Sequence, residues 1–110
     1  MEQTFYHIDR DDLYADIKIC LKEGELSLDG YDCGEFVENS PLIDSDDYEY
    51  HLKLDKENTQ KVFKVLKIAN KTDKQKLSFI TEKFKNDAGI SGFREYCEKH
   101  DIKAEFFCWP

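Results

Sequence analysis

The residues best suited to chemistry in this sequence are its cysteines and histidines, and their spacing decides what they could do. Nucleophilic catalysis needs a cysteine or serine beside a base. Cys97 and His100 lie three residues apart and form the one local cysteine–histidine pair. If both lie on one helix, with Cys97 buried and His100 stabilised by the helix dipole, the pair is structural. We therefore predict no catalytic residues and expect a protein that is not an enzyme.

A metal or cofactor site is not predicted either. His7, His51 and His100 are far apart, and none belongs to a ligand pair with zinc-site spacing. The stretch Asp44–Asp47 resembles part of a calcium loop, but Glu49 stands where an EF-hand needs glycine and no glutamate occupies the twelfth position. A glycine-rich phosphate loop and a dinucleotide-binding fingerprint are also missing from the sequence.

The four cysteines indicate a reducing compartment. Cys20, Cys33, Cys97 and Cys108 include no CxxC pair, and the first ten residues lack the basic start and apolar run of a secretory signal. No apolar stretch approaches the roughly 20 residues that cross a bilayer. We expect four free, mostly buried thiols in a cytoplasmic protein without a membrane partner.

Charge is distributed unevenly along the chain. Residues 1–55 hold 16 acidic and 4 basic side chains, whereas residues 56–110 hold 8 acidic and 12 basic ones, for a total of −8. An acidic surface repels phosphate backbones, so a nucleic-acid partner is not expected. It attracts a basic protein instead.

The acids are densest in a long predicted connection over residues 32–47. Loops of this length are often functional in compact domains. The predicted partner-binding residues are Asp32, Glu35, Phe36, Glu38, Asp44, Asp46 and Asp47, with Phe36 as the apolar anchor. The other interpretation of these acids is a solvated surface that keeps the protein in solution. Tyr31, Phe107 and Trp109 are further aromatic candidates for an interface, unless they close the core.

Strands are predicted in the first half of the chain. Phe5, Tyr6 and Ile8 suggest a short first strand. Residues 15–31 alternate between apolar and polar on either side of a turn at Lys22–Glu25, which predicts a β-hairpin. Residues 48–55 show the same alternation, and their tyrosines are expected at the core or its edge.

Helices are predicted after Asp55, where the period changes to 3.6. A helix capped by Asp55 is expected to bury Val62, Phe63, Leu66 and Ala69. A second helix, opened by the capping box of Thr72 and Gln75, is expected to bury Leu77, Ile80 and Phe84. A third, capped by Ser91 after a stop at Gly89, carries Phe93, Tyr96 and Cys97. The last strand, residues 102–109, is apolar on both faces and is expected centrally in the sheet or under a covering loop.

These elements predict one α+β domain over residues 1–110. The order β-β-β-β-α-α-α-β gives a mostly antiparallel sheet of four or five strands. Each of the two or three helices must bury its apolar stripe against that sheet, so the predicted architecture is a two-layer sandwich.

Three sequence blocks resemble a family of small uncharacterised bacterial proteins. They are residues 26–34 (LSLDGYDCG), residues 46–50 (DDYEY) and the ending from His100 through Trp109. The resemblance implies a bacterial cytosolic protein of one domain and brings no established activity or catalytic residues. Small acidic bacterial domains of this class include immunity proteins that neutralise toxins.

Three function classes follow. The first is an immunity-like inhibitor whose acidic first half binds a basic toxin or nuclease. The second is a small enzyme or ligand-binding domain with a pocket between sheet and helices, lined by Tyr48, Tyr50, His51 or Cys97. The third is a homo-oligomeric module that pairs through a sheet edge or the C-terminal aromatic residues.

Overall fold

The computed structural model describes residues 1–10, 13–34, 47–85 and 90–109. The strands are β1 (Glu2–Arg10), β2 (Leu13–Lys22), β3 (Glu25–Gly34), β4 (Asp47–Lys53) and β5 (Glu105–Trp109). The helices are α2 (Lys56–Val65), α3 (Asp73–Phe84) and α4 (Ile90–Lys99). The first strand, which the sequence only suggested, is therefore a full strand at the N-terminus.

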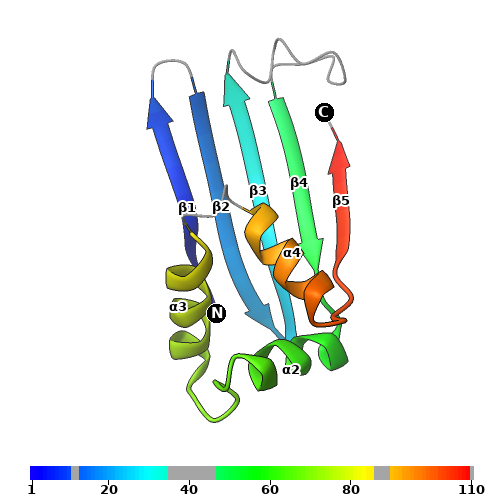
Figure 1. The fold of residues 1–110 in the computed structure, drawn as a ribbon. Helices are drawn as coiled ribbons and strands as arrows, with labels where there is room; N and C mark the ends of the chain where they lie inside the picture. The colour runs from blue at the N-terminus through cyan, green and yellow to red at the C-terminus, as the bar shows by residue number, and fades with distance from the viewer. Residues whose placement is uncertain (11–12, 35–46, 86–89, 110) are drawn as a thin grey trace.

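The strands form one antiparallel sheet in the order β1-β2-β3-β4-β5. Each strand pairs with its neighbour in sequence. The short connections from β1 to β2 and from β2 to β3 favour local antiparallel pairing, whereas β5 pairs with β4 across a long insertion. The three helices are inserted between β4 and β5 and lie on one face of the sheet, so the predicted α+β sandwich is confirmed (Figure 1).

Among the described elements, no helix lies on the other face of the sheet (Figure 1). On the covered side, α3 lies near β1, α4 lies in front of β3 and the lower part of β4, and α2 crosses the sheet at its lower end. The strands extend well beyond the helices, so the molecule is elongated, with extents of 43 × 23 × 23 Å. The arrangement leaves one side of the sheet exposed along its length.

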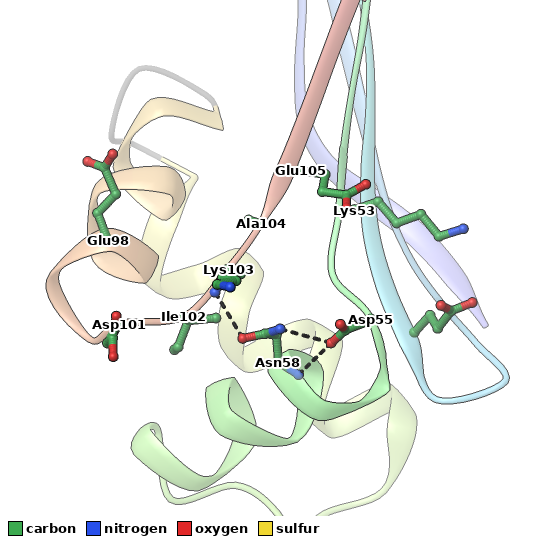
Figure 2. Close-up of a pocket in the computed structure, with 10 residues that line it drawn as sticks. Lys53, Asp55, Asn58, Glu98, Asp101, Ile102, Lys103, Ala104 and Glu105 are labelled. Carbon is green, nitrogen blue, oxygen red and sulfur yellow. Dashed lines mark hydrogen bonds between the residues drawn. The ribbon is translucent and has the colours of Figure 1, made fainter.

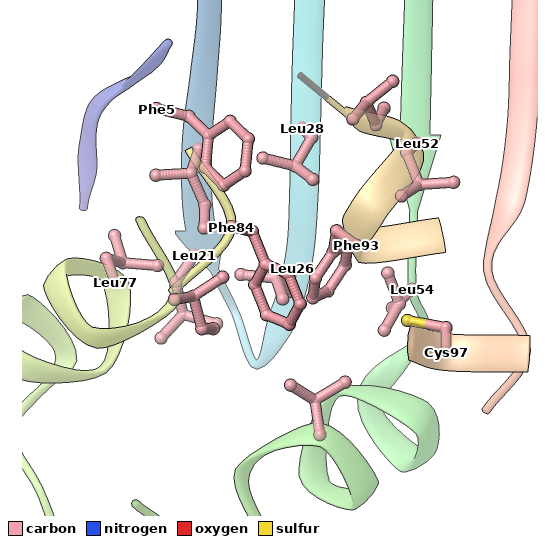
Figure 3. Packing of buried hydrophobic residues seen from close by; sticks show 14 of the residues in the cluster. Phe5, Leu21, Leu26, Leu28, Leu52, Leu54, Leu77, Phe84, Phe93 and Cys97 are labelled. Carbon is pink, nitrogen blue, oxygen red and sulfur yellow. The ribbon is translucent and has the colours of Figure 1, made fainter. Parts of the chain in front are cut away.

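The core lies between the helices and the covered face of the sheet (Figure 3). Alternation along the hairpin places Ile17, Ile19 and Leu28 in this layer, each at most 1% exposed. The helices contribute most of the apolar residues that the sequence predicted to be buried, and Phe93 packs among them without measurable exposure. The ring of Phe84 meets that of Phe93 edge to face, with centroids 5.3 Å apart.

The helix starts follow the predicted caps in two cases out of three. The Asp55 carboxylate accepts the Asn58 backbone N–H at 2.8 Å, and Thr72 and Gln75 form a reciprocal capping box. The third case is wrong, because α4 begins at Ile90 and Ser91 lies inside its first turn. Gly89 lies outside the described residues.

Helix α2 is shorter than the sequence predicted, because it ends before the last residue of the predicted apolar stripe. It ends at Val65, and Lys67 takes a positive φ of 61°, which turns the chain away from the helical path. Ala69 is therefore exposed rather than buried, and Ile68 occupies the core in its place, at 1% exposed. The turn at Lys67 therefore ends the helix before the apolar stripe that the sequence predicted to continue to Ala69.

The last strand is at the edge of the sheet and not at its centre. β2 and β3 already have partners on both sides, so the chain returning from α4 can pair only with an outer strand, β1 or β4, and it pairs with β4. Phe107 is consequently 46% exposed, and Cys108 is exposed as well. Apolar residues on both faces indicated a central strand, but an edge strand with exposed aromatic residues shows the same pattern.

Candidate protein-binding face

The candidate site is the side of the sheet opposite the helices, which we call the open face. Its members alternate with the core residues along each strand and are aligned by the strand register. They are Glu2, Thr4, His7, Asp9, Tyr14, Asp16, Lys18, Cys20, Lys22, Glu25, Ser27, Asp29, Tyr31, Glu49, His51, Lys53, Glu105 and Phe107.

The open face is acidic and the helical side is basic. The acids of the open face are Glu2, Asp9, Asp16, Glu25, Asp29, Glu49 and Glu105, against the lysines Lys18, Lys22 and Lys53. The basic residues of the second half lie on the helices and their connections: Lys56, Lys61, Lys64, Lys67, Lys71, Lys74, Lys76, Lys83, Lys85, Arg94, Lys99 and Lys103. The charge asymmetry along the sequence thus becomes an asymmetry between two sides of the molecule.

One group of ion pairs joins β1 and β2 on the open face. Asp16 lies 3.2 Å from the Nδ1 of His7 and 3.7 Å from the Nζ of Lys18. Lys18 also donates to the Thr4 hydroxyl at 2.9 Å. These groups are partly exposed, so they orient the side chains more than they stabilise the fold.

A second pair joins β3 and β4. The Nδ1 of His51 lies 2.7 Å from the Asp29 carboxylate, and both side chains are partly exposed. The pair borders a shallow cavity of about 460 Å³ whose walls include Cys20, Ser27 and Phe107. In this part of the open face, a hydrogen-bonded polar pair therefore lies beside the exposed ring of Phe107.

Aromatic rings gather on the same face, across β1, β2 and β3. His7 and Tyr14 meet edge to face with centroids 5.5 Å apart and planes at 88°. Tyr14 and Tyr31 follow at 6.2 Å and 67°. Tyr14 is 36% exposed, which leaves part of its ring for contact with another molecule.

A cavity lies at the base of the sheet, between the starts of α2 and β5 (Figure 2). It measures about 700 Å³ and is bordered by several charged side chains, Glu98, Asp101 and Glu105 among them. In the described part of the chain, no group of three or more His, Cys, Asp or Glu residues is placed to hold a metal ion. The cavity is open and mixed in charge, so it offers no defined ligand site.

Asn58 connects the elements around this cavity. Its amide donates to the Asp55 carboxylate at 2.9 Å and its carbonyl oxygen accepts the Lys103 backbone N–H at 2.9 Å (Figure 2). The hydrogen bonds from Asn58 lower the pKa of Asp55 below its usual value. These contacts have a structural role, because they join the start of α2 to the segment that precedes β5.

The predicted Cys97 and His100 pair is structural in the fold. Cys97 is 1% exposed, and burial raises the pKa of its thiol to about 12. His100 lies at the end of α4, where its ring packs against that of Tyr96 with centroids 4.3 Å apart. A thiol with this pKa stays protonated at neutral pH and is a poor nucleophile.

The residues of the predicted pocket lie on different sides of the sheet. Tyr50 is 5% exposed on the covered face, whereas His51, the next residue, lies on the open face. Cys97 is in the core, and the Tyr48 side chain lies outside the described residues. Tyr50, His51 and Cys97 therefore do not line one pocket.

The predicted binding connection is shorter than expected, because strand structure continues into it. Asp32 lies on β3 opposite Tyr48, and Asp47 begins β4 opposite Cys33. The other predicted partner-binding residues, Glu35, Phe36, Glu38, Asp44 and Asp46, lie outside the described residues.

Sequence reasoning missed the open-face acids as binding candidates. Asp16 and Asp29 are polar positions in the alternating segment 15–31, but a period of two does not show which face the helices cover. The available signal was the excess of acids over lysines at those polar positions.

Comparisons with known proteins add no relative. No protein-family model, no curated protein and no solved structure matches the chain. The resemblance to a family of small bacterial proteins therefore stays a prediction. Within the described residues, no helix has both the length and the apolar character needed to span a membrane.

Proposed function

We propose that the chain is a non-enzymatic protein-binding domain, an immunity-like inhibitor that acts in the cytoplasm and covers a basic surface of a toxin or nuclease. The observation that carries the proposal is the separation of charge between the two sides of the sheet. Acids predominate on the side without helices, and the lysine-rich helices lie on the other. Such a charge distribution orients an approaching basic partner toward the open face.

The size of the open face suits a protein partner. Five strands spaced by about 4.8 Å span roughly 20 Å, and the longest strands extend roughly 30 Å. The resulting area of roughly 600 Å² approaches the roughly 800 Å² that each partner buries in a standard protein interface. A small ligand would not require a surface of this extent.

The experiment measures binding to one purified basic protein, the product of a gene adjacent to this one, by isothermal titration calorimetry. Neutralising Glu2→Gln, Asp9→Asn and Glu49→Gln together removes three acids from the open face. We expect Kd to rise about tenfold, and the wild-type affinity to fall between about 50 mM and about 300 mM salt.

A matched control neutralises three acids on the helical side: Glu95→Gln, Glu98→Gln and Asp101→Asn. The net charge changes by the same amount, and asparagine tolerates the positive φ of 57° at position 101. The control should bind as the wild type does. Equal weakening by both variants would show attraction by net charge alone and would contradict a specific open-face interface.

A further inference from the structure

Three aromatic rings of the open face lie together near one end of β1, β2 and β3; those of His7 and Tyr14 are exposed and that of Tyr31 is half-buried. We call His7, Tyr14 and Tyr31 the aromatic corner. Because neighbouring rings meet at steep angles, the corner presents both ring faces and ring edges. The faces of tyrosine rings carry negative potential and attract cations.

Carboxylates surround the aromatic corner. The strand register places Asp9 directly opposite Tyr14, and it places Asp16 and Glu49 on either side of Tyr31. Directly opposite positions on one face of an antiparallel pair have Cβ atoms about 5 Å apart. The rings are thus flanked by acids on β1, β2 and β4.

Elsewhere in the chain, cationic side chains pack over aromatic rings. On the helical side, the Arg94 guanidinium lies 4.1 Å from the Phe106 centroid, and Lys76 lies 4.6 Å from that of Phe63. Among the residues that the structure describes, no lysine or arginine of this chain lies over Tyr14. The face of this ring is therefore not covered by a lysine or arginine from that part of the chain.

We propose that the aromatic corner receives an arginine side chain of the basic partner. Arginine fits better than lysine, because its planar guanidinium stacks on a ring while its N–H groups donate to carboxylates at the edge of the plane. Tyr14 and Tyr31 supply the rings, and Asp9 and Glu49 supply acceptors beside them. This inference rests on the proposed function and names the contact that gives it specificity.

The test uses acetyl-Gly-Arg-Gly-amide as the probe, with the lysine and citrulline peptides as comparisons. Titration into isotopically labelled protein is followed by amide chemical shifts. The arginine peptide should shift the amides of Tyr14 and Tyr31 saturably and bind more tightly than the lysine peptide. Citrulline has a similar shape without the charge, so the citrulline peptide should shift neither the Tyr14 amide nor the Tyr31 amide. Equal response to citrulline, or shifts confined to the Glu98 and Asp101 region, would overturn the proposal.

Paired variants separate ring stacking from hydrogen bonding. Tyr14→Leu with Tyr31→Leu should weaken binding of the arginine peptide about fivefold, because the ring faces are lost. Tyr14→Phe with Tyr31→Phe keeps the rings and should bind within about twofold of the wild type. Both pairs should retain the wild-type pattern of remote amide shifts, which verifies folding.

The outcomes also distinguish this inference from the proposed function. If the leucine pair binds the arginine peptide as the wild type does, the aromatic corner is not the arginine site. Binding of the basic protein could still depend on Glu2, Asp9 and Glu49. If neutralising those acids has no effect on that protein, the proposed function fails whatever the peptide shows.

Discussion

Gly30 on β3 lies directly beneath the ring of Tyr50, and a side chain at this position has no room. A Cβ built on Gly30 would overlap the ring carbons and hydroxyl of Tyr50, which is itself 5% exposed. Gly30→Ala should therefore destabilise the fold by about 1–3 kcal/mol in denaturant unfolding. Tyr50→Leu in the same chain should recover part of that loss, whereas Tyr50→Phe should not. A stability of Gly30→Ala equal to that of the wild type would contradict the packing.

The cysteines should differ sharply in reactivity. Cys108 is exposed on the edge strand, whereas Cys97 is buried with its pKa raised to about 12. At about pH 8, alkylation followed by mass spectrometry should modify Cys108 rapidly and Cys97 only after unfolding. Because the pKa of Cys97 is higher in the folded state, its contribution to stability is present below about pH 9 and is lost as the pH rises toward about 12. Modification of native Cys97 at the rate of Cys108 would contradict its burial.

At the scale of elements, Asn58 holds α2 against the segment that leads into β5. It is 5% exposed and hydrogen-bonded to Asp55 and to the backbone of Lys103. Asn58→Ala leaves the Lys103 N–H without its partner and should lower the free energy of unfolding by about 1–3 kcal/mol. Asn70→Ala, at an exposed turn position, is the control and should change stability little. Equal free energies of unfolding for the two variants would contradict this structural role of Asn58.

For the whole molecule, the position of each strand in the sheet should set its local stability. β3 has partners on both sides and lies under the helices, whereas β5 has one partner and exposed side chains. Native-state hydrogen exchange should therefore be slowest in β2 and β3, and faster in β5 on the order of 100-fold. Equal protection of β3 and β5 would mean that the edge is covered in solution, as expected if two copies pair through β5. Light scattering would test that pairing.

Much of the fold could be predicted from the sequence, because it depends on local chemistry. Alternation specified the hairpin and the strand that contains Tyr50, and capping by Asp55 and Thr72 specified where two helices start. Composition and charge predicted an acidic domain suited to a basic partner. Such patterns depend on neighbours a few residues apart, which the sequence lists directly.

The tertiary structure decided which face of the sheet the helices cover, and therefore which acids share a surface. Period-two alternation is the same whichever side is covered, so it could not identify Asp16, Asp29 and Glu49 as neighbours on one open face. It also decided that the last strand lies at an edge, because β2 and β3 already had partners on both sides and the chain returning from α4 pairs with the outer strand β4. Contacts between residues distant in sequence, such as Tyr14 with Tyr31, exist only once the strands pair.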